Sequence, residues 1–92
     1  MQTVFPHTLR LKMKKDSALH TVPIESVFAK EICSQESIEN EITYYQDKGK
    51  FSYIPTATMS DRKYLILEGS SIYYASYSMG LDNLTVKVRS VN

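Results

Sequence analysis

A run of strict alternation near the start of the chain constrains the fold more than any other feature. Apolar and cationic side chains alternate through the segment Leu9–Lys15, which reads LRLKMKK. Successive side chains of a β-strand point to opposite faces of the sheet, so this period of two predicts a strand with one apolar and one cationic face. A sheet buries its apolar face against another layer, which leaves the cationic face exposed.

The middle of the chain has the spacing expected of helices. The tripeptide Thr21-Val22-Pro23 is typical of a helix start, and the apolar residues that follow it at i, i+3, i+4 and i+8 are Ile24, Val27, Phe28 and Ile32. A second stripe consists of Ile38, Ile42 and Tyr45, with Ser34 or Ser37 as its N-cap and Gly49 as its stop. These patterns predict two short helices, or one long helix that is kinked near Ser34.

Tyrosines and β-branched residues become frequent after Gly49, and alternation returns. We predict a polar loop over residues 56–61, a tight turn at Gly69-Ser70 and strands over the segments Phe51–Ile54, Lys63–Glu68, Ser71–Tyr77 and Leu84–Arg89. Short turns between the last three strands predict an antiparallel meander.

This order of elements predicts a single α+β domain over residues 1–92. We expect a two-layer sandwich, in which an antiparallel sheet of four or five strands has one or two helices on one face. The last strand repeats the pattern of the first, because Leu84, Val86 and Val88 alternate with polar or cationic residues. Both terminal strands are therefore expected to point aliphatic side chains at the helices and cations at solvent.

Charge is unevenly distributed along the 92 residues. The net charge is only +1, but residues 21–47 contain six acids and one base, and cations dominate the flanks. The predicted helices are therefore acidic and are a possible contact for a basic protein partner, although acids on a helix exterior are commonly only solvated. Cys33 is the only cysteine, and no segment resembles a secretory signal or a membrane span. These features favour a cytoplasmic protein, in the host cell if the protein is viral.

The proposed binding face follows from the two alternating strands. Lysine and arginine side chains on a regular surface neutralise phosphates without reading base sequence, and tyrosine rings offer stacking surfaces. The candidate residues for binding nucleic acid or a nucleoprotein are Arg10, Lys12, Lys14, Lys15, Lys87, Arg89, Tyr73 and Tyr77. The alternative is an ordinary solvated face whose cations discourage edge-to-edge aggregation.

Catalytic and cofactor motifs are absent from the sequence. His7, His20 and Cys33 lack the paired spacing of zinc ligands, so no metal site and no cofactor are predicted. Cys33 follows an apolar stripe and is expected to be a small buried hydrophobic residue. We therefore predict that the protein is not an enzyme; the remaining enzymatic hypothesis is an active site that is completed by oligomerisation.

In size and in segregated charge, the chain resembles small phage-encoded anti-defence proteins such as anti-CRISPRs. The resemblance rests on no motif and carries over no residue roles. It implies a non-enzymatic inhibitor that docks on a nucleic-acid-containing assembly, such as a host CRISPR-type complex. The alternative is a protein–protein adaptor, or a small subunit of a larger complex, that makes no contact with nucleic acid.

Overall fold

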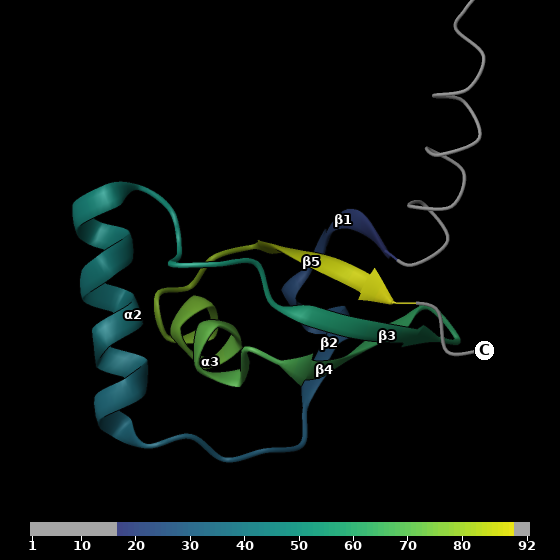
Figure 1. Cartoon of the computed structure of the whole chain (residues 1–92), viewed down its shortest axis with the longest axis horizontal. Helices are drawn as coiled ribbons and strands as arrows, with labels where there is room; N and C mark the ends of the chain where they lie inside the picture. Colours follow the sequence, from purple (N-terminus) through teal and green to yellow (C-terminus); the bar gives the residue numbers. More distant parts are fainter. Residues whose placement is uncertain (1–16, 90–92) are drawn as a thin grey trace, which may run out of the picture.

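A mixed five-stranded sheet forms the centre of the computed structural model, which describes residues 17–89 (Figure 1). The strands lie in the order β1-β5-β3-β4-β2. Their bounds are β1 Ser17–Pro23, β2 Val27–Ala29, β3 Thr56–Ser60, β4 Lys63–Glu68 and β5 Asn83–Arg89. A single 3₁₀ turn, η1, covers Ile24–Ser26, and the two helices are α2, Gln35–Lys48, and α3, Ser70–Ser78. The strand predicted for the alternating segment Leu9–Lys15 lies outside the described residues.

The predicted α+β class and the number of strands are confirmed, but the antiparallel meander is wrong. β5 pairs antiparallel with β1 and parallel with β3, while β4 pairs antiparallel with β3 and parallel with β2. Helix α3 follows β4 and connects it to β5, which lies on the other side of β3 in the same sheet. Helix α3 lies between the sheet and α2 (Figure 1), so both helices are on the same side.

The helix predicted over residues 24–32 is wrong. Its apolar stripe is divided between η1, β2 and the following loop, where Val27 is buried and Ile32 is 93% exposed. Strand β1 ends at Pro23 and is hydrogen-bonded to β5 along its length. Hydrogen bonding to strands that are distant in sequence therefore outweighs the helical spacing of apolar residues over the short segment 24–32.

The strand predicted over residues 71–77 is a helix. Its buried residues include Ile72, Ala75 and Ser76, which follow one another at i, i+3 and i+4. The hydroxyl of Ser76 donates a hydrogen bond of 2.8 Å to the carbonyl of Ile72 one turn earlier. The high tyrosine content suggested a strand, but burial of this helical stripe decides the conformation.

Segment 51–61 also differs from expectation. Residues 51–55 form an irregular linker instead of a strand, and the predicted polar loop contains β3. Ala57 of β3 is fully buried and lies opposite Ile66 of β4. Threonines on both sides of Ala57 are good strand formers, so a polar composition did not exclude a strand.

Helix α2 agrees with the second of the two predicted helices. The Ser34 hydroxyl accepts a hydrogen bond from the backbone N–H of Ser37, as an N-cap residue does, and Gly49 ends the helix in the left-handed conformation with φ 79°. Among the described residues, no helix is both long and apolar enough to span a membrane.

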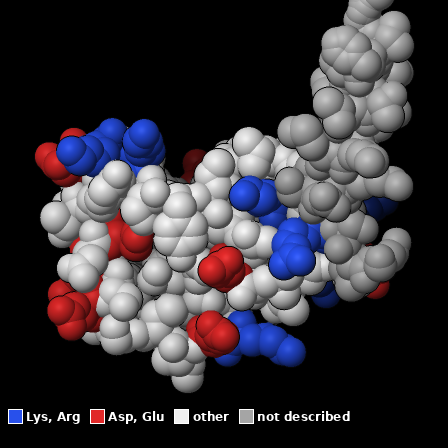
Figure 2. Space-filling model, in the orientation of Figure 1, with Lys and Arg blue, Asp and Glu red and all other residues white. Residues whose placement is uncertain are grey.

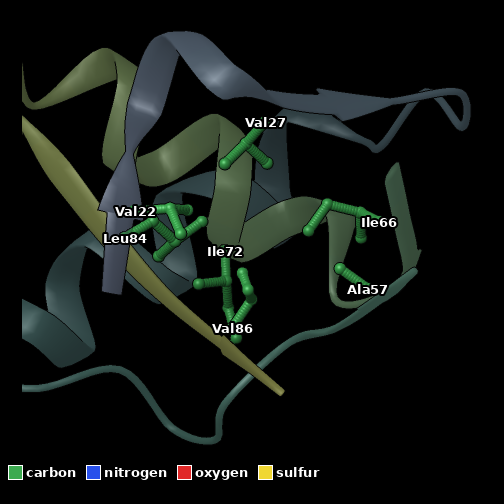
Figure 3. Packing of buried hydrophobic residues seen from close by; sticks show 7 residues of the cluster. All are labelled: Val22, Val27, Ala57, Ile66, Ile72, Leu84 and Val86. Carbon is green, nitrogen blue, oxygen red and sulfur yellow. The ribbon is translucent and has the colours of Figure 1, made fainter. Parts of the chain in front are cut away.

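The core lies between the sheet and α3. The side chain of Ile72 reaches from α3 toward the strands and lies close to Val86 of β5 (Figure 3). The buried cluster consists of Val22, Val27, Ala57, Ile66, Ile72, Leu84 and Val86. Because Leu84 and Val86 face this core, the alternate residues of β5 point away from α3.

Candidate functional site

The two described cations of the predicted basic face lie on β5. Lys87 and Arg89 are exposed, and Leu84 and Val86 are buried, as the alternation predicted. Lysine and arginine side chains lie over the end of this strand, and a second group of them lies beside acidic side chains over one end of α2 (Figure 2). The other predicted members of the basic face, Arg10, Lys12, Lys14 and Lys15, lie outside the described residues.

The arrangement of β5 changes the expected geometry of that face. Leu19 of β1 lies beside Lys87 on one side, and Thr56 of β3 lies beside it on the other. Over Lys87 and Val88, β5 therefore has a neighbouring strand on each side and no free edge. The exposed side chains nearest to Lys87 on β1 include Leu19, which is 60% exposed.

The predicted stacking tyrosines are neighbours on α3 and not on a strand. The rings of Tyr73 and Tyr77 are 6.4 Å apart and nearly parallel, at 24°. Tyr77 is 67% exposed, whereas Tyr73 packs against the core. Since α3 covers the side of the sheet opposite to Lys87 and Arg89, the structure does not bring the tyrosines and the cations together.

The start of α3 is a more specific site, and the sequence did not indicate it. Gly69 precedes the helix with φ 104° and ψ 29°, a left-handed backbone conformation that residues other than glycine rarely adopt. A Cβ atom on Gly69 would lie 2.7 Å from the Cβ of Pro55, which is itself buried. Both backbone conformation and space therefore require glycine at this position.

The first turn of α3 has unsatisfied hydrogen-bonding capacity. The first N–H groups of any helix lack partners within the helix, and no side chain caps those of α3. Ser70 is only 6% exposed, and its hydroxyl makes no hydrogen bond with another described residue. Ser71 follows it and is half-buried. The N–H groups of Ile72 and Tyr73 donate to the Gly69 carbonyl, at 3.0 and 3.3 Å. The N–H groups and hydroxyls of Ser70 and Ser71 have no such partner among the described residues, and donors at a helix start suit an anion.

Pro55 and Tyr53 lie beside this helix start. The ring of Tyr53 would contact a Cβ placed on Gly69, at 3.4 Å. Burial raises the pKa of the Tyr53 hydroxyl above its ordinary value, and the carboxylates of Glu41 and Glu68 raise this pKa further. The hydroxyl therefore stays protonated at neutral pH and remains a hydrogen-bond donor.

Cys33 lies in the loop before α2, and it contributes to the raised pKa of the Tyr53 hydroxyl. Burial raises the pKa of its thiol, and the neighbouring carboxylate of Glu31 adds to the effect. Since the thiolate is the reactive form, this environment does not activate Cys33 as a nucleophile. Over residues 17–89, no three His, Cys, Asp or Glu side chains are grouped so that they could hold a metal ion.

Comparisons with known proteins identify the fold but no family. No protein-family model and no curated protein sequence matches this chain. Among solved structures, the chain is similar to C-terminally truncated ParB from Caulobacter crescentus, a chromosome-partitioning protein complexed with CTP-gamma-S, with a TM-score of 0.67 and 19% identity. The similarity covers 82% of this chain and 46% of that ParB chain.

Two further structures have the same fold. Sulfiredoxin from Arabidopsis thaliana has a TM-score of 0.68 and 15% identity, and the match covers 80% of this chain and 86% of sulfiredoxin. A free serine kinase in complex with AMP has a TM-score of 0.67 and 16% identity, with 79% of this chain and 30% of the kinase covered. The chain thus spans less than half of the ParB and kinase chains that it matches. Identities this low show a shared fold.

Proposed function

We propose that this protein binds a nucleotide or another phosphate ester at the start of α3. The observation that carries the proposal is the uncapped first turn of α3 beside Gly69, together with the buried hydroxyl of Ser70. The similar folds lend support, because the ParB structure holds CTP-gamma-S and the serine kinase structures hold AMP or ADP.

The chemistry of the site suits a phosphate. Phosphate oxygens accept hydrogen bonds from free backbone N–H groups, and the positive end of the helix dipole favours their negative charge. The hydroxyls of Ser70 and Ser71 add two side-chain donors. Gly69 fixes the position of this helix start, because Pro55 occupies the space beside its Cα.

Binding without catalysis is part of the proposal. The thiol of Cys33 and the hydroxyl of Tyr53 both have raised pKa values, so neither is poised as a nucleophile or a base at neutral pH. We therefore propose a ligand-binding module, although sulfiredoxin and the serine kinase show that enzymes also use this fold.

The experiment is a calorimetric titration of the full chain with CTP and with AMP, with and without Mg²⁺. Replacing Ser71→Asp places a carboxylate where the phosphate would lie. The carboxylate interacts favourably with the helix dipole, so the melting temperature is expected to stay the same or rise slightly. Nucleotide affinity is expected to fall by about tenfold or more through charge repulsion.

Ser78→Asp is the matched control, because Ser78 is the last residue of the same helix and is exposed. It introduces the same charge far from the proposed phosphate, so nucleotide affinity is expected to remain within about twofold of the natural protein. Absence of nucleotide binding at millimolar concentration contradicts the proposal, and so does equal binding by the Ser71→Asp variant.

A second candidate function is docking on a nucleic-acid-containing assembly through the basic face, as an inhibitor of the anti-CRISPR kind. The exposure of Lys87 and Arg89 on the same face of β5 favours it. The double variant Lys87→Glu with Arg89→Glu is expected to lose salt-sensitive binding to single-stranded or duplex nucleic acid. Lys48→Glu, at the end of α2, is the control.

If the double variant binds nucleic acid as well as the natural protein, docking through β5 is wrong. Binding of a protein partner that survives high salt would instead favour the adaptor hypothesis. The acidic surface of α2, with Glu36, Glu39 and Asp47 exposed, would then be the first contact to test by charge reversal.

A further inference from the structure

A separate pocket of about 550 Å³ lies between the C-terminal end of α2, the linker 49–55 and the start of β5. This volume is within the range of small-molecule sites. The walls include Tyr53 and Pro55, but neither Gly69 nor the serines that follow it. The pocket is therefore distinct from the site proposed at the start of α3.

Aromatic side chains form much of the pocket wall. Tyr44 and Tyr45 come from α2, and Phe51 and Tyr53 come from the linker. The rings of Tyr45 and Phe51 pack on each other with their centroids 4.6 Å apart, which fixes one side of the pocket. Leu84 of β5 also lines the pocket and is only 4% exposed. The walls thus combine packed residues with exposed rings.

Exposed apolar surface is concentrated around this pocket. Tyr44 is 36% exposed, Tyr53 48% and Ile54 39%, so that a third of the large exposed apolar side chains of the described residues surround a single cavity. Flat aromatic walls with open edges suit a ligand that is itself flat and aromatic, because offset stacking adds to the gain from burial.

The charge of the pocket selects among aromatic ligands. Lys50 is the only charged residue that lines it. Among residues 17–89, Lys50 makes no ion pair, whereas Lys48, two residues earlier, lies 3.7 Å from the carboxylate of Asp47. Aromatic rings alone would also attract cations, but a lysine at the wall opposes a cation and favours an anion. The carboxylate of Glu41 does not line the pocket and accepts a hydrogen bond from the wall residue Ser52, so an anionic group is expected on the Lys50 side.

A polar group on the β5 side completes the pocket. Asn83 lines it and is exposed, and its amide makes no hydrogen bond with another described residue. The hydroxyls of Ser52 and Thr85 already have partners, since the Thr85 hydroxyl lies 2.8 Å from that of Thr21 and Ser52 donates to Glu41. The Asn83 amide therefore remains available to orient a ligand, together with the tyrosine hydroxyls of the pocket wall.

We propose that this pocket binds a small aromatic anion, a molecule with one or two rings and a carboxylate or sulfonate group. The rings lie against Tyr44 and Tyr53, and the anionic group is attracted by Lys50. This site adjoins the one in the nucleotide proposal, because Tyr53 borders both, but it uses neither the N–H groups at the start of α3 nor the serines there.

The experiment titrates the full chain with anilinonaphthalene sulfonate, which carries both chemical features, and follows probe fluorescence and amide chemical shifts. The largest shifts are expected in the linker 49–55 and at the C-terminal end of α2. Tyr44→Ala is expected to weaken binding by about tenfold, since a stacking wall is lost. Lys50→Ala is expected to weaken it by about threefold at low salt and to have little effect at high salt.

The matched controls remove the same chemistry elsewhere. Tyr77→Ala removes a tyrosine that is 67% exposed on α3, and Lys48→Ala removes the lysine that is paired with Asp47. Phe28→Ala removes an exposed aromatic ring from β2. All three variants are expected to bind the probe within about twofold of the natural protein, and so is Ser71→Asp.

Several results would overturn this inference. They are absence of probe binding, unchanged binding by both Tyr44→Ala and Lys50→Ala, and an equal loss in a control variant. Tighter binding of the cationic probe phenyltrimethylammonium than of the anionic one would also overturn it. If circular dichroism shows that Tyr44→Ala is unfolded, Lys50→Ala and the chemical shifts of the natural protein decide the outcome.

Discussion

Helices α2 and α3 pack against each other, but their conformations have different origins. α2 contains no buried residue and has its own end signals, the Ser34 cap and Gly49. α3 has no side-chain cap and only nine residues, of which four are buried, namely Ser70, Ile72, Ala75 and Ser76. An isolated helix of nine residues is unstable in water. α2 is therefore specified largely by local sequence, and α3 by the core that it helps to form.

This difference also affects whether the first turn of each helix can bind a ligand. The first turn of α2 uses the Ser34 hydroxyl to satisfy its own backbone. The first turn of α3 begins at a glycine and leaves its N–H groups without a side-chain partner. A helix start that satisfies itself has little to offer a ligand, whereas one held in place by packing remains free to bind.

The largest expected effect comes from removing core contacts of α3. Ile72→Ala is expected to lower the free energy of unfolding by about 4 kcal/mol, because Ile72 is fully buried and a cavity would remain. Ile42→Ala in α2 is expected to cost only about 1 kcal/mol, because Ile42 is half-buried. Urea unfolding followed by circular dichroism measures both. Equal losses would remove the proposed distinction between the helices.

The glycines beside the two helices provide the next comparison. Gly69→Ala combines a left-handed backbone with a contact of 2.7 Å to Pro55 and is expected to cost about 3 kcal/mol. Gly49→Ala has φ 79° but nothing within 4 Å of the new Cβ, so about 1 kcal/mol is expected. The same urea experiment measures the pair, and a larger loss for Gly49→Ala would contradict the comparison.

Loss of the α2 cap should have a smaller effect. Ser34→Ala removes the acceptor for the Ser37 N–H and is expected to cost about 1 kcal/mol. Ser71→Ala, in the first turn of α3, removes no such bond and is expected to change stability by less than about 0.5 kcal/mol. Thermal unfolding measures both variants. A cost for Ser71→Ala as large as that for Ser34→Ala would mean that α3 is also capped.

The smallest expected effect is on the pH dependence of stability. Burial raises the pKa of the Tyr73 hydroxyl above its ordinary value of 10.0, and Tyr74 and Tyr77 raise it further. The unfolded chain therefore releases this proton first, so stability is full below about pH 10 and falls as pH rises above it. Tyr73→Phe is expected to make this decline shallower in urea unfolding near pH 11. An unchanged slope would contradict the assignment to Tyr73.

Sequence patterns correctly predicted the elements whose conformation is determined by nearby residues. The cap at Ser34, the stop at Gly49 and the alternation from Leu84 to Arg89 each act over a few residues, and each was confirmed. Strand β1 was missed because its conformation depends on pairing with β5, 60 to 72 residues away. The turn at Ile24–Ser26 follows from it, since the Ile24 N–H donates to the carbonyl of Asp82, just before β5. Pairing between such distant segments cannot be recognised from the residues of one segment alone.

The candidate site was predicted only in part. Exposure of Lys87 and Arg89 follows from alternation alone. Tyr73 and Tyr77 were expected on one face of a strand, and they are neighbours because the segment is a helix. The start of α3 was missed because a tyrosine-rich segment suggested a strand. A signal was present, since the buried residues of α3 follow Gly69 at helical spacing.

The position of β5 within the sheet has a consequence for synthesis. This strand follows the other four in the chain, yet it lies between β1 and β3. While the ribosome is still translating residues 83–89, β1 has no partner, and the sheet can contain only β2, β3 and β4. Closure of the sheet is therefore delayed until these residues emerge from the exit tunnel.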